Sequence, residues 1–161
     1  MLSLSKKTDY ALLALSYLTR TEAGRAVNTK EIAERYAIPV ELLAKILQKL
    51  AKADLLASTP GPTGGYRLAR PASEISVGAV IEVIDGPPAI IHCMKTVHSG
   101  CEQLDHCTIR KPLTRINTKI LQMLAHISLE EINREEGESA DIPFVTHRES
   151  HARTHELISS L

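Results

Sequence analysis

Residues 39–52 constrain the fold of this chain more than any other stretch, because their apolar positions follow the period of a helix. Leucines and isoleucines recur there at spacings of three and four, which places them along one side of a helix. Most remaining positions are polar or basic, and Pro39 suits a first helical turn, where its missing N–H needs no partner. Such a helix must bury one side in a core and expose the other. The buried positions are Leu42, Leu43, Ile46, Leu47 and Leu50.

Two further helices are predicted upstream of this one. Residues 8–18 are rich in helix formers, and residues 29–36 follow Asn28 as an N-cap, with Glu31 three positions later as in a capping box. Only two residues, Ala37 and Ile38, then lead to Pro39. A turn this short, between a small helix and one with opposed apolar and basic sides, is typical of the helix-turn-helix motif.

A β-hairpin is predicted directly after the third helix. Its strands are Leu55–Thr59 and Tyr66–Ala69, on either side of the Gly- and Pro-rich residues 60–65. In this position a hairpin is the wing of a winged-helix DNA-binding domain; a hairpin that only closes a small helical domain is the alternative.

Charge is unevenly distributed along the chain. Residues 1–70 hold 11 Lys/Arg and 6 Asp/Glu, a net charge of +5, whereas residues 71–161 have a net charge of −5. This asymmetry favours contact between the N-terminal half and phosphates.

Composition indicates a mainly α-helical, cytoplasmic protein. The chain has no Trp, one Phe and four Tyr, so its core must consist of Leu, Ile, Val and Ala, which favours packed helices. No apolar run approaches the roughly 20 residues that span a bilayer, and the first residues lack the apolar block of a signal peptide. We therefore expect no membrane partner.

All three cysteines fall in residues 89–111, called here the cysteine segment, after a helix over 77–84 that Gly86-Pro87-Pro88 ends. The spacing C-x7-C-x5-C differs from the paired CxxC of structural zinc sites, and an odd cysteine count argues against a disulfide framework. Three thiolates from one loop suit an iron–sulfur cluster, zinc or copper; three unligated cysteines are the alternative. The cysteines are Cys93, Cys101 and Cys107.

A long helix is predicted from Pro112 to about Ile127. Its apolar positions repeat at near-heptad spacing, which favours burial against a second copy of the chain; packing on its own domain is the alternative. The chain from residue 130 onward is acidic and then mixed, and we assign no site to the histidines at 147, 151 and 155. The apolar positions are Leu113, Ile116, Ile120, Met123, Leu124 and Ile127.

The predicted organisation is a winged-helix DNA-binding domain with a small β-hairpin wing, followed by a long C-terminal dimerisation helix. Its five parts differ in expected role. They are the winged helix 1–70, a connector helix 71–88, a cluster-binding loop 89–111, the dimerisation helix 112–132 and a flexible tail 133–161. No Gly-rich phosphate loop, CxxC pair or α/β pattern is present, so we expect no enzymatic activity.

Several stretches match the pattern of one family. They are Leu4–Ala11, Leu43–Leu47, Gly61–Pro71, Ile75–Val77, Ile84–Pro87 and the cysteine segment followed by Arg115-Ile116-Asn117. On these residues, which together span about 4–132, the chain resembles the winged-helix iron–sulfur repressors that include IscR, NsrR and RirA. Among them it is most similar to the regulators of SUF-type cluster assembly.

This resemblance implies a two-fold homodimer whose C-terminal helices cross and which binds near-palindromic double-stranded DNA. It also implies that the three cysteines hold a [2Fe–2S] or [4Fe–4S] cluster near the dimer interface. Asp9 matches the position from which one relative supplies a fourth ligand from the other subunit, and His106 and His98 are local candidates. The cysteine spacing resembles that of iron-sensing members, which favours iron or cluster status as the signal.

Residues 39–52 are then expected to enter the major groove, with the start of the first helix and the wing on phosphates. The wing departs from the family pattern at Pro60, where relatives often carry Arg, and Arg67 is the candidate substitute. A zinc-stabilised or cluster-free dimeric DNA-binding protein with a thiol switch is the alternative function. The candidate DNA contacts are Ser5, Lys6, Lys7, Thr29, Glu41, Lys45, Gln48, Lys49, Thr63 and Arg67.

Overall fold

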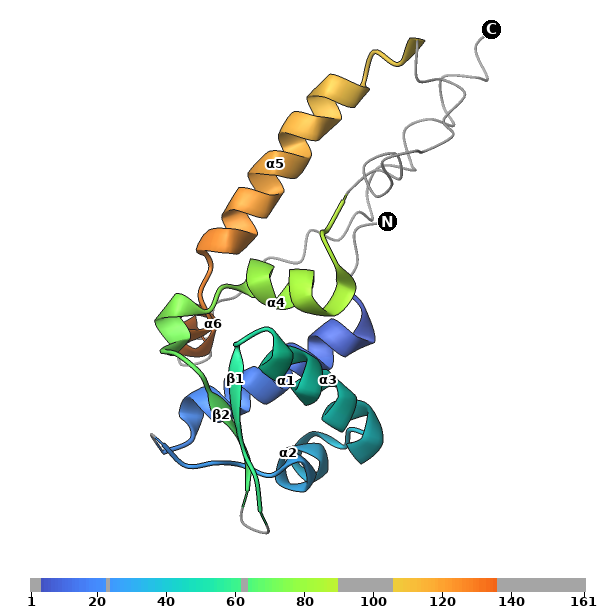
Figure 1. The fold of residues 1–161 in the computed structure, drawn as a ribbon. Helices are drawn as coiled ribbons and strands as arrows, with labels where there is room; N and C mark the ends of the chain where they lie inside the picture. The colour runs from blue at the N-terminus through green and yellow to red at the C-terminus, as the bar shows by residue number, and fades with distance from the viewer. Residues whose placement is uncertain (1–3, 23, 62–63, 90–105, 136–161) are drawn as a thin grey trace, which may run out of the picture.

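The computed structural model describes residues 4–22, 24–61, 64–89 and 106–135, and Figure 1 shows their arrangement. The fold is mainly helical with one two-stranded antiparallel hairpin, which confirms the predicted class. The elements in chain order are α1 (Lys6–Arg20), α2 (Thr29–Tyr36), α3 (Val40–Lys52), β1 (Leu56–Thr59), β2 (Gly65–Leu68), η1 (Ala72–Glu74), α4 (Val77–Asp85), α5 (Arg110–His126) and α6 (Leu129–Glu135).

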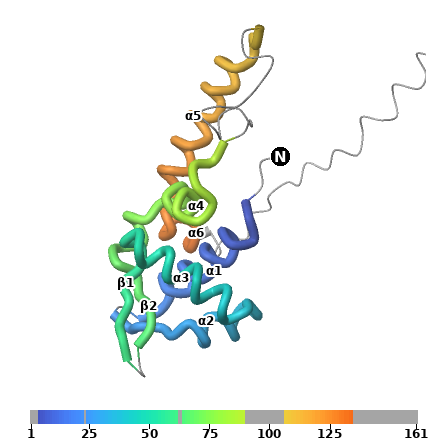
Figure 2. Tube along the Cα trace, turned by 45° about the vertical axis from the view of Figure 1, so that its right-hand side comes forward, coloured from blue at the N-terminus to red at the C-terminus, as the bar shows by residue number. Residues whose placement is uncertain are grey.

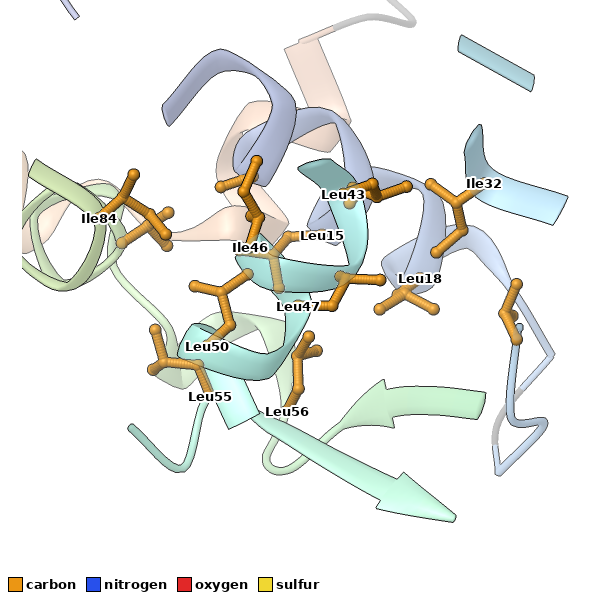
Figure 3. Packing of buried hydrophobic residues seen from close by; sticks show 14 of the residues in the cluster. Leu15, Leu18, Ile32, Leu43, Ile46, Leu47, Leu50, Leu55, Leu56 and Ile84 are labelled. Carbon is orange, nitrogen blue, oxygen red and sulfur yellow. The ribbon is translucent and has the colours of Figure 1, made fainter. Parts of the chain in front are cut away.

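The core forms where α1, α2 and α3 meet, with the hairpin along one side (Figure 3). Asn28 caps α2 as expected, since its side chain accepts a hydrogen bond from the backbone N–H of Glu31. Ala37 then adopts a left-handed conformation with φ of 52°, which ends α2 and turns the chain into α3 within three residues. The apolar side of α3 is buried at Leu43, Ile46, Leu47 and Leu50.

The hairpin needs glycine at the start of β2. Tyr66 exchanges two backbone hydrogen bonds with Val27, so β2 lies between β1 and Val27, two residues before α2. A Cβ at Gly65 would lie less than 3.0 Å from the Val27 carbonyl, and one at Gly64 would be equally close to the Thr59 carbonyl. The two glycines therefore allow the close backbone approach that joins the wing to the helical core.

Helix α5 forms an arm that extends from the core. Its C-terminal end packs on α4, where Gly78 lies so close that an added Cβ would meet the backbone of Leu124 and Ala125 at 3.0–3.1 Å. Its N-terminal end points away from α1, α2 and α3 in both views of the backbone (Figures 1 and 2). Ile116 and Met123 of the predicted apolar stripe are exposed by 48% and 56%, and Ile109, just before α5, is exposed by 61%. The other four stripe residues, Leu113, Ile120, Leu124 and Ile127, are half-buried.

The helix predicted from Pro112 to about Ile127 corresponds to α5, but the rest of the segment 112–132 belongs to a second helix, α6. The backbone is extended at Ile127, and Ser128 then caps α6 by accepting a hydrogen bond from the N–H of Glu131 at 3.1 Å. Leu129 is 1% exposed and belongs to the main core. Residues 127–135 therefore return to the N-terminal domain, because burial of Leu129 outweighs continuation of a straight helix.

The other helices differ from expectation only at their ends. Helix α1 begins at Lys6 rather than Thr8, because Ser5 is its N-cap, and it continues to Arg20 rather than Leu18. Helix α3 begins at Val40, with Pro39 as its N-cap. None of the helices within the described ranges has the length and apolar content needed to cross a membrane.

Candidate nucleic-acid interface and cysteine segment

The exposed side of α3 carries three of the predicted DNA contacts. Glu41, Lys45 and Gln48 are all exposed, and they lie opposite the buried apolar stripe of the same helix. Val40 at the start of α3 is also 46% exposed, although it is apolar. An exposed helix of this kind, preceded by a short helix and a tight turn, has the geometry of the recognition helices that enter the major groove of DNA.

A shallow groove lies between α3 and the wing. It has a volume of about 320 Å³ and opens to solvent. Its polar groups are donors of the type that contact a DNA backbone, and they extend the exposed side of α3 onto the hairpin. Three of its residues, Lys52, Ser58 and Tyr66, were not among the predicted contacts, although Lys52 lies one helical turn beyond Gln48. The groove is lined by Gln48, Ala51, Lys52, Ser58 and Tyr66.

Two predicted contacts, Lys49 and Ser5, make hydrogen bonds within the protein. The Lys49 ammonium group donates to the backbone carbonyl of Ile84, at the end of α4, at 3.0 Å. The Ser5 hydroxyl donates to Oδ1 of Asp85 at 2.6 Å. Both side chains therefore hold the DNA-binding domain against α4, a role that the sequence pattern did not indicate.

The remaining predicted contacts are spread over the same domain. Lys6 and Lys7 are exposed in the first turn of α1, and Arg67 is exposed on β2. Thr29 is half-buried at the first position of α2. Thr63 lies outside the described residues.

Asp85 is the centre of a polar cluster at the N-terminus of α1. Besides the Ser5 hydroxyl, it accepts hydrogen bonds from the Ser5 backbone N–H at 3.2 Å and from the Thr8 hydroxyl at 2.8 Å. Partial burial alone would raise the pKa of the Asp85 carboxyl. The hydrogen bonds from Ser5 and Thr8 and the nearby positive charge of Lys49 outweigh burial, so that the pKa lies below its ordinary value.

The candidate metal ligands are only partly within the described residues. Cys107 is a half-buried free cysteine just before α5, and His106 beside it is exposed. Cys93 and Cys101 lie outside the described residues, as do His98 and the histidines at 147, 151 and 155. In the parts of the chain that the structure describes, no three His, Cys, Asp or Glu side chains gather as a metal site.

Asp9 lies on the first turn of α1 and is exposed. The start of α1 and the start of α5, which follows Cys107 closely in the sequence, are far apart in both views of the backbone (Figures 1 and 2). Within one protomer, Asp9 and Cys107 are therefore not brought together. A shared site would need the arm of one copy to reach the first helix of another.

Comparison with known proteins identifies the family. A family model described as Rrf2, iron-dependent transcriptional regulator, matches residues 4–135, which include all elements described above. The chain belongs to the Rrf2 family of transcriptional regulators. Its match ends at the last residue of α6, so the returning helix is part of the family domain.

Individual relatives agree with this assignment. The chain is 31% identical over 137 residues to the transcriptional regulator NsrR of Oceanobacillus iheyensis, covering 85% of this chain and 93% of that protein. It is 32% identical over 129 residues to the transcriptional regulator IscR of Sodalis glossinidius, covering 80% of this chain and 77% of that protein. Among solved structures, CymR, the global cysteine regulator of B. subtilis, has a TM-score of 0.66 at 25% identity and covers 83% of this chain and 98% of its own.

The family assignment confirms three of the sequence predictions. This Rrf2 protein is a DNA-binding transcriptional regulator and not an enzyme. Its fold is the mainly helical one with a two-stranded hairpin found in CymR. The exposed side of α3 and the adjoining groove are the candidate surfaces for DNA.

Proposed function

We propose that this Rrf2 protein is a homodimeric regulator that senses iron, iron–sulfur cluster or redox status through a cluster held by three cysteines. The observation that carries the proposal is the placement of Cys107 just before α5, an arm whose other end is attached to the DNA-binding domain (Figure 1). A ligand bound at that end is mechanically connected to the helices that contact DNA. The cysteines proposed as ligands are Cys93, Cys101 and Cys107.

The apolar stripe of α5 supports a homodimer. Ile109, Ile116 and Met123 follow a spacing of seven along one side of the arm, with Leu113 and Ile120 half-buried between them. Exposed apolar residues at heptad spacing are typical of a helix that packs against a second, equivalent helix. Two arms that cross in this way would carry the cysteine end of each protomer toward the core of the other.

The donor set fits an iron–sulfur cluster in its chemistry. Thiolates are the preferred protein ligands of such clusters, and three cysteines leave one coordination position for another group. Asp9 of the partner subunit is the candidate for that position, because its exposed side chain lies on the first turn of α1, near the place that a crossing arm would reach. His106, exposed beside Cys107, is the alternative within the same protomer. The bound cluster would supply a redox-active and labile centre.

On DNA, the two copies of α3 are proposed to enter successive major grooves of a near-palindromic site. Lys45 and Gln48 then face base edges and phosphates, and Glu41 is a candidate base reader. The exposed lysines of α1, Lys6 and Lys7, and the wing would contact phosphates. A change at the cysteine end would shift the population of dimers whose two α3 helices have the correct separation.

Anaerobic reconstitution tests the cluster. Protein purified without oxygen and treated with iron and sulfide should turn brown, and native mass spectrometry should show a dimer with iron and acid-labile sulfide in fixed ratio. Replacing the three cysteines by alanine should abolish the colour. The loaded and stripped forms should also differ in affinity for an operator selected from random DNA, and equal affinities would contradict sensing by the cluster.

A second candidate is a cluster-free or zinc-stabilised dimer with a thiol switch. The structural likeness to CymR of Staphylococcus aureus favours it, because one solved structure of that protein is of an oxidized form; the TM-score is 0.63 at 25% identity. Stoichiometric zinc without labile sulfide in anaerobically purified protein would select this candidate. Loss of operator binding on mild oxidation, restored by a thiol reductant, would identify the switch.

A further inference from the structure

The C-terminal end of α4 holds both helices that are expected to contact DNA. Asp85, its last residue, receives three hydrogen bonds from Ser5 and Thr8 at the start of α1. One residue earlier, the Ile84 carbonyl receives the Lys49 ammonium group of α3. Ser5 and Asp85 are separated by 80 residues in sequence, so these bonds fix the position of the first helix relative to the connector.

The contact at Asp85 has the properties of a specific attachment. A carboxylate at a helix N-terminus is favoured by the helix dipole and by the free N–H groups of the first turn. Thr8 is completely buried, and the described partner of its hydroxyl is Asp85. Asparagine at this position keeps one acceptor oxygen where the carboxylate offers two to the three donors of Ser5 and Thr8, and it removes the negative charge that the start of α1 favours. The replacement therefore weakens the attachment of the start of α1 to the end of α4.

Asp85 also lies at a junction in the chain. Gly86, with φ of 84°, ends α4, and its N–H bonds to the Glu82 carbonyl. From there the sequence continues to the cysteine segment, whereas α4 itself packs against the arm α5. Helix α4 therefore connects the arm, which packs on it at Gly78, to the helices of the DNA-binding domain, which its last two residues hold.

We propose that Asp85 is a positioning residue for DNA recognition, which fixes α1 and, through the neighbouring Lys49 contact, α3 relative to the arm. In the dimer this attachment sets the separation of the two recognition helices, and hence the half-site spacing that the protein prefers. The inference rests on the proposed homodimer. It does not require a bound cluster, so cluster-free protein suffices to test it.

The test compares Asp85→Asn with the matched variant Asp54→Asn. Asp54 is exposed, lies just after α3 and has a positive φ of 56°, which asparagine tolerates, so its replacement removes the same charge without removing this attachment. Each protein is titrated with duplexes that carry two copies of a selected half-site at a series of spacings, and with a duplex that carries one half-site. Melting temperatures are measured on the same samples.

Wild-type protein and Asp54→Asn should show a sharp optimum of spacing. Asp85→Asn should lose about tenfold in affinity at that optimum, or about 1.4 kcal/mol, and bind neighbouring spacings almost equally well. Its affinity for the single half-site should fall much less than its affinity at the optimal spacing, because the surface of α3 is unchanged and only the phosphate contacts of Lys6 and Lys7 depend on the start of α1. A lower melting temperature with an unchanged spacing profile would show a purely structural role and overturn the inference.

Hydrogen exchange provides a readout that does not depend on DNA. The N–H groups of Thr8 and Asp9 bond to Ser5, so both amides should exchange about tenfold faster in Asp85→Asn than in Asp54→Asn. Unchanged exchange at both amides overturns the inference whatever the titrations show. If wild-type protein has no preferred spacing, the proposed dimeric recognition fails instead, and the exchange result alone decides whether Asp85 holds α1.

Discussion

Replacing Leu129 by alanine should destabilise the whole winged-helix domain, although Leu129 lies beyond the arm in sequence. The side chain is 1% exposed and belongs to the main core cluster. Alanine removes three carbon groups, whose transfer from the core to water costs about 0.8 kcal/mol each. The cavity adds to this loss, but α6 is short and can partly collapse onto it. We therefore expect a loss of about 3 kcal/mol in the free energy of unfolding.

Urea denaturation followed by far-UV circular dichroism measures this loss, at one protein concentration because a dimer unfolds in a concentration-dependent way. Leu13→Ala is the control, since it removes the same atoms from a side chain of α1 that is 39% exposed. Its cost should be about 1 kcal/mol or less. Equal losses in the two variants would refute the reasoning, because α6 would then open separately from the core that it is inferred to complete.

Three further predictions concern the wing, the polar cluster and the DNA surface. Gly65→Ala should cost about 2 kcal/mol and abolish operator binding, because its Cβ forces apart the two hydrogen bonds between Val27 and β2; an unchanged melting temperature would contradict this. The pKa of Asp85 lies below its ordinary value of 3.8, so its contribution to stability is present at neutral pH and disappears as the pH falls below about 4. The difference in free energy of unfolding between wild type and Asp85→Asn, measured by urea denaturation from pH 7 to 3, should therefore shrink over that range. A difference that stays constant with pH would contradict the lowered pKa of Asp85. Lys45→Ala should weaken binding to the selected operator about tenfold more than binding to scrambled DNA, measured by fluorescence anisotropy; equal weakening would indicate a phosphate contact.

Local patterns in the sequence were sufficient to predict the helix-turn-helix and the wing. The bounds of α2, 29–36, agree with the structure, because Asn28 provides a cap and the short turn after Tyr36 leaves little room for another end. Helix α3 and the hairpin are placed to within one residue at each end, since helical spacing and the glycines at 64 and 65 restrict them strongly. These features depend on neighbouring residues alone.

Features that depend on distant contacts were not predicted. Helix α6 has seven residues and few apolar positions, too few to show a period, and only its contact with the core makes it a distinct helix. Lys49 lies among polar residues of α3, which suggested a DNA contact, but its ammonium group reaches Ile84. Asp85 appeared only as the end of a helix, because its partners are 77 and 80 residues away.

The return of α6 to the core changes what the arm can do. Backbone hydrogen bonds from Val77 to Ile127 and from Leu129 to Ile75 fix the C-terminal end of α5, each at 2.9 Å. A helix of 17 residues is about 25 Å long, so a small shift at its cysteine end would become a rotation at this fixed point. That point borders α4, whose end holds α1 and α3 through Asp85 and Lys49. A dimerisation helix that simply ended in a free tail would transmit no such rotation, because nothing would hold its base.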